Sequence, residues 1–159
     1  MAIQVGEKIP DVTLKTMTSE GMKDITTQEI FSGKRVVLFA VPGAFTPTCS
    51  NNHLPGFVDK ADEILGKGVD TIACISVNDP FVMTAWGQDR KADKVLMVAD
   101  GNGDFTRAVG LEMDGSGFGL GTRCQRYALV AENGVVTHLA VDEGGKLDVS
   151  SAEAILGVL

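Results

Sequence analysis

Apolar and polar positions show two periodicities along this chain, one typical of β-strands and one typical of α-helices. Alternating positions, or a short unbroken apolar run, are typical of a strand, whereas apolar residues three and four positions apart are typical of a helix. Val12 and Leu14 alternate with polar neighbours, and 36–41 is the longest strongly apolar run. The whole pattern predicts strands over residues 11–18, 22–25, 35–41, 71–77, 94–99, 126–131 and 135–141.

Capping residues mark where the helices should begin. Thr26 and Ser150 each stand three positions before a glutamate, which is the spacing of a capping box. Asp79 followed by Pro80 is a typical helix start. Pro55 is expected to kink the helix around it or to split off its first turn. The pattern predicts helices over residues 27–31, 57–65, 80–90 and 103–109, and from 150 towards the end of the chain.

The order of these elements predicts one α/β domain over residues 1–159. Strands alternate with helices first, and a hairpin and a final helix follow, with Asn133-Gly134 as the commonest two-residue hairpin turn. The glycine-rich stretch 114–121 is expected to be a loop. This order is typical of a central mixed β-sheet flanked by helices on both faces.

Composition and charge exclude several classes of partner. The chain is 44% hydrophobic and 22% charged, as a globular domain is, and its net charge of -7 disfavours binding to nucleic acid. The longest apolar run is too short to cross a membrane, and the N-terminus lacks the apolar core of a signal peptide. We therefore expect a cytoplasmic protein, although a leader removed from the chain would point to an organelle.

No metal or cofactor is expected from the sequence. The two histidines lie far apart, and no cysteine pair has the spacing of zinc ligands. The segment 100–104 (DGNGD) lacks the glycine and the glutamate that a calcium loop requires at its sixth and twelfth positions.

Three cysteines at low density favour a reducing compartment over a secreted disulfide framework. Cys49 differs from an ordinary packing cysteine because it follows a buried strand and the bend at Pro42, just before a helix. The first amides of a helix have no internal partner and favour negative charge, so a thiol there is readily ionised. Thr46 occupies the position of the other cysteine of a C-x-x-C dithiol, and its hydroxyl can donate to the thiolate.

The pattern Pro42-x-x-x-Thr46-x-x-Cys49 resembles the active-site signature of peroxiredoxins. The longer string PGAFTPTCSNNHLPGF is similar to the type II subfamily, the peroxiredoxin-5 class, in its plant and bacterial form. The similarity continues through CISVNDPFVMTAW and RYALVAENG and covers essentially the whole chain. It implies a thioredoxin-like fold and no cofactor.

The resemblance implies a thiol-dependent peroxidase that reduces hydrogen peroxide and alkyl hydroperoxides, in antioxidant defence and redox homeostasis. Cys49 would be the nucleophile and would become a sulfenic acid. Thr46 would bond the sulfur and the peroxide, Pro42 would shield the pocket, and Arg126 would hold the thiolate and polarise the peroxide. Glutaredoxin with glutathione, or thioredoxin, would recycle the enzyme. We expect the sulfur of Cys49 to be open to solvent and close to both the helix start and the guanidinium.

Four further residues have two interpretations each. Arg123 competes for the catalytic arginine role, although a surface or dimer contact is favoured for it. His53 lies four residues after Cys49 and either supports the site or merely packs beside it. Cys74 lies mid-strand, where a thiol is inert by default. The plant and bacterial type II peroxiredoxins that this chain resembles have a cysteine in a similar sequence context, and a resolving role is assigned to it. Cys124 should point to the same side as Arg126 on an extended strand and could intercept the sulfenate, or it is a small loop residue.

Apolar residues in or beside loops predict a homodimer: Phe45, Phe81, Phe118 and Leu120. Local core packing is the competing explanation for them. Two other functions remain beside the peroxidase, a thiol redox sensor or reductase that passes oxidation to another protein, and a non-enzymatic scaffold. The presence of Pro42, Thr46, Cys49 and Arg126 together disfavours the scaffold.

Overall fold

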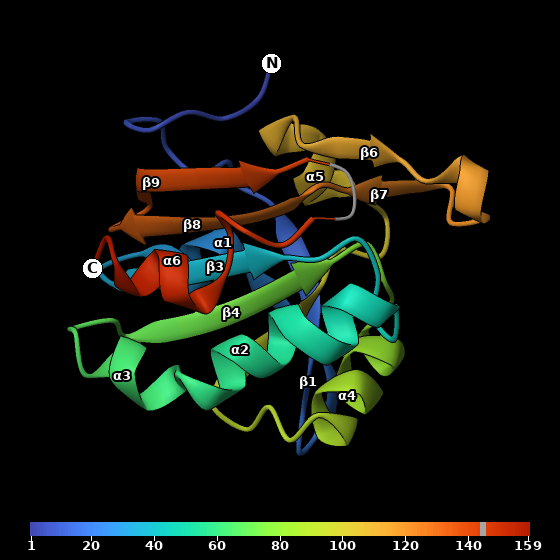
Figure 1. The fold of residues 1–159 in the computed structure, drawn as a ribbon, viewed down its shortest axis with the longest axis horizontal. Helices are drawn as coiled ribbons and strands as arrows, with labels where there is room; N and C mark the ends of the chain where they lie inside the picture. The colour runs from blue at the N-terminus through green and yellow to red at the C-terminus, as the bar shows by residue number, and fades with distance from the viewer. Residues whose placement is uncertain (144–145) are drawn as a thin grey trace.

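A computed structural model describes residues 1–143 and 146–159 of the chain. Its centre is a seven-stranded mixed sheet in the order β2-β1-β5-β4-β3-β8-β9 (Figure 1). The neighbours β3, β4 and β5 run parallel, and every other pairing in this sheet is antiparallel. The strands are β1 Thr13–Thr18, β2 Gly21–Thr26, β3 Arg35–Ala40, β4 Thr71–Ser76, β5 Val95–Ala99, β8 Arg126–Glu132 and β9 Val135–Asp142.

Helices cover both faces of this sheet, as predicted (Figure 1). One apolar cluster includes Phe57, Ile64, Trp86 and Ile155 from four helices, and the cluster on the other face draws on α1 and α5. Side chains of β3 alternate between the two clusters, which explains its unbroken apolar run. The helices are α1 Thr27–Phe31, α2 Leu54–Asp59, α3 Ala61–Leu65, α4 Pro80–Asp89, α5 Asp104–Val109 and α6 Ala152–Leu156, and a π-helix, η1, spans Cys49–His53.

Two of the three predicted helix starts are confirmed, and one is wrong. Thr26 and Glu29 form the capping box of α1, and the Asp79 carboxylate accepts a hydrogen bond from the Val82 amide at the start of α4. At α6 the capping residue is Ser151, which accepts from the Ala154 amide, and Ser150 is not the cap. The hydroxyl of Ser150 instead donates to the Asp142 carboxylate at 2.6 Å.

The stretch predicted as a loop over 114–121 is partly ordered. A second sheet pairs β6 Glu112–Asp114 with β7 Thr122–Cys124, and a short 3-10 helix, η2 Ser116–Phe118, lies between them. Gly119 and Gly121 have positive φ, which lets the chain reverse tightly enough for two three-residue strands to pair.

The topology brings three segments that are distant in sequence to one edge of the sheet. β3 ends there, and because β8 runs antiparallel to it, β8 begins there, with Ala40 opposite Tyr127. β9 runs back along β8 and ends at the same edge, with Asp142 opposite Arg126. Within the described ranges every helix is too short or too polar to span a lipid bilayer.

Candidate active site

Cys49 lies in the first turn of the helix that follows β3, as the sequence predicts. The chain leaves β3, bends at Pro42, and becomes helical at Pro47. The amide of Ser50 donates to the Thr46 carbonyl at 2.9 Å, which makes Pro47 the first helical residue, a position that proline favours. The free amides and the dipole of this first turn favour an anion at Cys49.

The turn that contains Cys49 is a π-helix, in which the amide of Leu54 reaches back five residues to the Cys49 carbonyl. α2 begins after this widened turn, and Pro55 lies in its first turn, where the missing amide hydrogen costs no helical bond. The prediction that Pro55 splits off a first turn is therefore confirmed. Such π-helical turns occur frequently at functional sites.

Arg126 brings a buried positive charge to the sulfur. Its Nη2 donates to Cys49 Sγ at 3.1 Å, and its Nη1 donates to His53 Nδ1 at 2.9 Å. Arg126 is 3% exposed, and within the described residues no carboxylate forms an ion pair with it. A buried charge without a counter-ion is costly, so a thiolate at Cys49 would supply the compensation that the guanidinium otherwise lacks.

His53 is held as a neutral ring between two partners. Its Nδ1 accepts from Arg126, so its proton is on Nε2, which donates to the Ser150 carbonyl at 2.9 Å. Burial and the positive charge of Arg126 lower the pKa of His53 to about 3. The ring is therefore uncharged at neutral pH and acts as a hydrogen-bond acceptor for the guanidinium. His53 also lies against the rings of Phe39 and Phe57.

The loop between β3 and the helix is closed by its own polar groups. The hydroxyl of Thr46 donates to the Gly43 carbonyl at 2.6 Å and not to Cys49 Sγ, so the predicted bond to the sulfur is not formed in this structure, and its oxygen lone pairs are free to accept. Pro42 is buried at the start of the loop. Phe45 has a φ of 63°, which a non-glycine residue adopts only at a cost, and such strain gathers at functional sites.

Arg123 does not contact the sulfur. Its Nε donates to the Leu120 carbonyl at 2.9 Å, and its Nη1 approaches the Pro42 carbonyl at 3.4 Å. Of the two candidate arginines, it is Arg126 that lies within bonding distance of Cys49 Sγ.

The other two cysteines are buried and free. Cys74 lies in the middle of β4, opposite Phe39 and Met97, and burial raises the pKa of its thiol well above the ordinary value. Cys124 ends β7, where its thiol donates to the Val41 carbonyl at 3.1 Å and burial raises its pKa to about 12. Both environments oppose the thiolate form that redox chemistry requires.

Cys124 departs from its predicted orientation. Gln125 lies between β7, which belongs to the two-stranded sheet, and β8, which belongs to the seven-stranded sheet, so Cys124 and Arg126 are in different strands. Cys124 packs in one apolar cluster, whereas Arg126 bonds Cys49 in the other. The same-side prediction is therefore wrong, and Cys124 is a buried strand residue rather than a loop residue.

The sulfur is also less accessible than predicted. Cys49 is 0% exposed and belongs to the apolar cluster that includes Phe39, Leu54 and Phe57. The expectation of an open sulfur is thus not met in this structure, whereas the helix start and the guanidinium are both in place.

Sequence reasoning missed several polar groups around the site. The Ala44 amide donates to Asn78 Oδ1 at 3.0 Å, and Ser76 Oγ lies 2.8 Å from the Val41 carbonyl. Trp86 Nε1 donates to Ser50 Oγ at 2.9 Å. Ser76 ends β4, the parallel neighbour of β3, and Asn78 follows it; the common carboxyl edge of these strands is a signal that could have identified them. Across the described residues no three His, Cys, Asp or Glu side chains cluster as metal ligands.

Comparison with known proteins gives one consistent match. A model of the Redoxin family matches residues 4–156. Peroxiredoxin-2E-2, chloroplastic, from Oryza sativa subsp. japonica is 54% identical over 99% of this chain and 72% of its own length. Peroxiredoxin-2D from Arabidopsis thaliana is 49% identical over 99% of this chain and 98% of its own length. The crystal structure of reduced Prx3 from Vibrio vulnificus in complex with H2O2 has a TM-score of 0.95 and 54% identity, covering 98% of both chains.

Proposed function

The chain belongs to the Redoxin family as a type II peroxiredoxin, a thiol peroxidase with a thioredoxin-like fold, and we propose that Cys49 reduces both hydrogen peroxide and alkyl hydroperoxides. The observation that carries the proposal is the 3.1 Å contact between Arg126 Nη2 and Cys49 Sγ in the first turn of a helix. The similar Prx3 of Vibrio vulnificus has been crystallised in complex with H2O2, which supports this substrate.

The proposed reaction needs only the residues of this site. The thiolate of Cys49 attacks one peroxide oxygen, an S–O bond forms as the O–O bond breaks, and sulfur gives up two electrons. The leaving hydroxide or alkoxide takes up a proton, which balances the one that the thiol lost on ionisation, and becomes water or an alcohol, while Cys49 becomes a sulfenic acid. Arg126 stabilises the negative charge on sulfur and then on the departing oxygen. Its Nε has no partner among the described residues and is a further donor for the peroxide.

Thr46 and Pro42 complete the proposed peroxide site. The Thr46 hydroxyl already donates to Gly43, so its free lone pairs can accept the hydrogen of the peroxide and orient it. Pro42 is buried at the start of this loop and shields the reacting atoms from water. Because Cys49 is covered in this structure, the proposal requires a small opening of the first helical turn.

We further propose that an external thiol reduces the sulfenic acid. Neither Cys74 nor Cys124 favours the thiolate, because burial raises the pKa of both. A disulfide between Cys49 and the mid-strand Cys74 would require backbone movement in the centre of the sheet. Glutaredoxin with glutathione, or thioredoxin, is therefore the expected reductant, in a reducing compartment such as the cytoplasm.

Coupled peroxidase assays test this function. The purified protein is given hydrogen peroxide or an alkyl hydroperoxide, with NADPH consumption linked either to thioredoxin and its reductase or to glutaredoxin, glutathione and its reductase. We expect sustained turnover with at least one of these systems. Oxidation of Cys49 without turnover in either system, together with a stable mixed disulfide to another protein, would instead indicate a redox sensor.

A homodimer would cover the apolar side chains that the monomer exposes. Phe45, Phe81 and Phe118 are 52%, 63% and 87% exposed. Phe45 belongs to the loop before Cys49, so we propose that the dimer forms around the active site. Sedimentation equilibrium of the wild type and of Phe118→Asp tests this: the wild type should be dimeric and the variant shifted towards monomer. A monomeric wild type at micromolar concentration would rule the dimer out.

A further inference from the structure

We propose that Asp142 is a positioning residue for the peroxide reaction, which acts on Cys49 through Ser150, His53 and Arg126. The inference rests on the peroxidase function proposed above and adds to it a residue at the far end of a hydrogen-bonded series. Asp142 ends β9 at the same sheet edge as the active site and is 6% exposed.

The Asp142 carboxylate organises the segment that follows it. It accepts hydrogen bonds from the backbone amides of Asp148, Val149 and Ser150 at 3.0 to 3.1 Å and from the Ser150 hydroxyl at 2.6 Å. Burial opposes its charge, but these bonds outweigh burial and hold the pKa of Asp142 below its ordinary value. Four donors on one carboxylate fix the backbone at Ser150 and therefore the direction of its carbonyl.

That carbonyl is the acceptor that fixes His53. His53 Nε2 donates to Ser150 O at 2.9 Å, which leaves Nδ1 unprotonated and aimed at Arg126 Nη1, also at 2.9 Å. The other end of the guanidinium donates to Cys49 Sγ at 3.1 Å. The planar guanidinium of Arg126 is held in one orientation when both Nη1 and Nη2 are hydrogen-bonded. The position of Nη2 at the sulfur therefore depends on the position of the His53 ring.

The Asp142 carboxylate bonds the 148–150 segment and not the guanidinium. Asp142 stands opposite Arg126 in the β8–β9 register, yet it forms no ion pair with Arg126. This leaves the positive charge of Arg126 for the sulfur. It also means that the effect of Asp142 passes through the ring of His53, which makes the proposal testable.

The test is a double-mutant cycle on the rate of Cys49 oxidation by hydrogen peroxide. Trp86 is the only tryptophan, and its Nε1 bonds Ser50, the neighbour of Cys49, so its fluorescence should report oxidation in stopped flow. Asp142→Ala and His53→Ala should each slow oxidation by roughly tenfold, since small misplacements of a catalytic group have effects of this size or larger. Because both act in one series, the double variant should also be slowed by roughly tenfold, not a hundredfold.

A conservative variant guards against a protein that fails to fold. Asp142→Asn keeps an acceptor oxygen for the Ser150 groups but places an amide against one of the donors. Oxidation of Cys49 should be slowed less in Asp142→Asn than in Asp142→Ala. If Asp142 acted without holding the 148–150 segment, this difference would not be expected.

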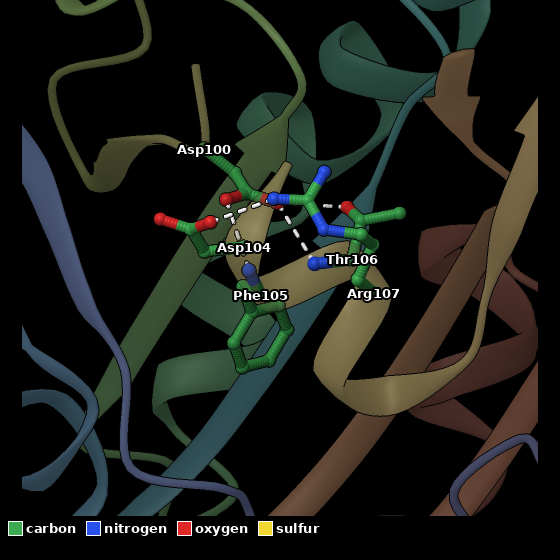
Figure 2. Close-up of polar contacts among 5 residues, drawn as sticks. All are labelled: Asp100, Asp104, Phe105, Thr106 and Arg107. Carbon is green, nitrogen blue, oxygen red and sulfur yellow. Dashed lines mark hydrogen bonds and ion pairs between the residues drawn. The ribbon is translucent and has the colours of Figure 1, made fainter. Parts of the chain in front are cut away.

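Asp100 provides a matched control (Figure 2). Its carboxylate is also buried and also bonds backbone and hydroxyl groups, those of Phe105 and Thr106 at 2.8 to 3.1 Å, at the start of α5. None of these partners bonds Cys49, Arg126 or His53 in the described part of the chain. Asp100→Ala should lower the stability of the fold and leave the oxidation rate of the folded protein within about twofold of wild type.

The outcomes separate this inference from the proposed function. If peroxide did not oxidise Cys49 in the wild type, the proposed peroxidase function would be wrong. A wild type that is oxidised, with Asp142→Ala as fast as Asp100→Ala, or with Asp142→Ala and His53→Ala slowing oxidation multiplicatively, would overturn the role of Asp142 alone.

Discussion

Cys49→Ser is expected to abolish peroxide-dependent consumption of reductant, with a loss of more than about a thousandfold. A serine hydroxyl is of similar size, so the turn should still form, but it is not ionised at neutral pH even beside a guanidinium. The peroxide would then meet no nucleophile, and no sulfenic acid could form at this position. NADPH-coupled turnover measures the loss, and trapping with a sulfenic-acid reagent followed by mass spectrometry locates the oxidised residue.

Cys74→Ser and Cys124→Ser are the controls for this prediction, because both remove a buried free thiol. Single-turnover oxidation by peroxide should continue in both, since burial keeps these thiols protonated and neither bonds Arg126. Cys124→Ser preserves a donor for the Val41 carbonyl and should be the milder change to the fold. Equal losses in Cys49→Ser and Cys74→Ser would overturn the assignment of Cys49 as the sole nucleophile.

Much of the fold follows from local patterns in the sequence. The unbroken apolar runs became β3 and β4, which are buried on both faces, and Asn133-Gly134 joins β8 to β9. These features depend on side-chain periodicity and on turn geometry, both of which a single sequence displays. The same holds for Thr26 and Glu29, whose capping box requires only residues of one turn.

The wrong predictions concern residues whose conformation depends on segments that are distant in the sequence. Ser150 has the spacing of a helix cap, but the carboxylate of Asp142 accepts its hydroxyl, and Ser151 caps α6 instead. Cys124 and Arg126 have strand spacing, but Cys124 ends β7 in the two-stranded sheet and Arg126 begins β8 in the seven-stranded sheet. Neither arrangement can be predicted from local sequence, because the topology of the sheets decides which segments meet.

The site shows the same division. The strand, the bend and the helix start that hold Cys49 are local, so the sequence predicts them. The burial of the sulfur and the His53 tautomer depend on packing between β3, β8 and the 148–150 segment. That packing exists only once the sheet has assembled, which is why the open sulfur was wrongly expected.

The second large effect is expected at Arg126. Arg126→Lys keeps a positive charge but has a single nitrogen, which cannot bond Cys49 Sγ and His53 Nδ1 together as the guanidinium does. We expect the rate of Cys49 oxidation by peroxide to fall by about a hundredfold, which corresponds to about 2.7 kcal/mol of transition-state stabilisation. Arg126→Met removes the charge as well and should lose more. Stopped-flow oxidation across a range of peroxide concentrations gives the second-order rate constants.

Arg123→Lys is the discriminating comparison, because Arg123 belongs to the same segment and competed for the same role. Its guanidinium contacts the Leu120 and Pro42 carbonyls and not the sulfur, so its replacement should change the rate by less than about threefold. The argument is one of charge balance. Arg126 is buried and forms no ion pair with a carboxylate among the described residues, so a thiolate at Cys49 would be its counter-ion, and removing either member would leave the other uncompensated. A hundredfold loss in Arg123→Lys with a near-normal Arg126→Lys would show that the charge stabilising the reaction comes from elsewhere in the loop.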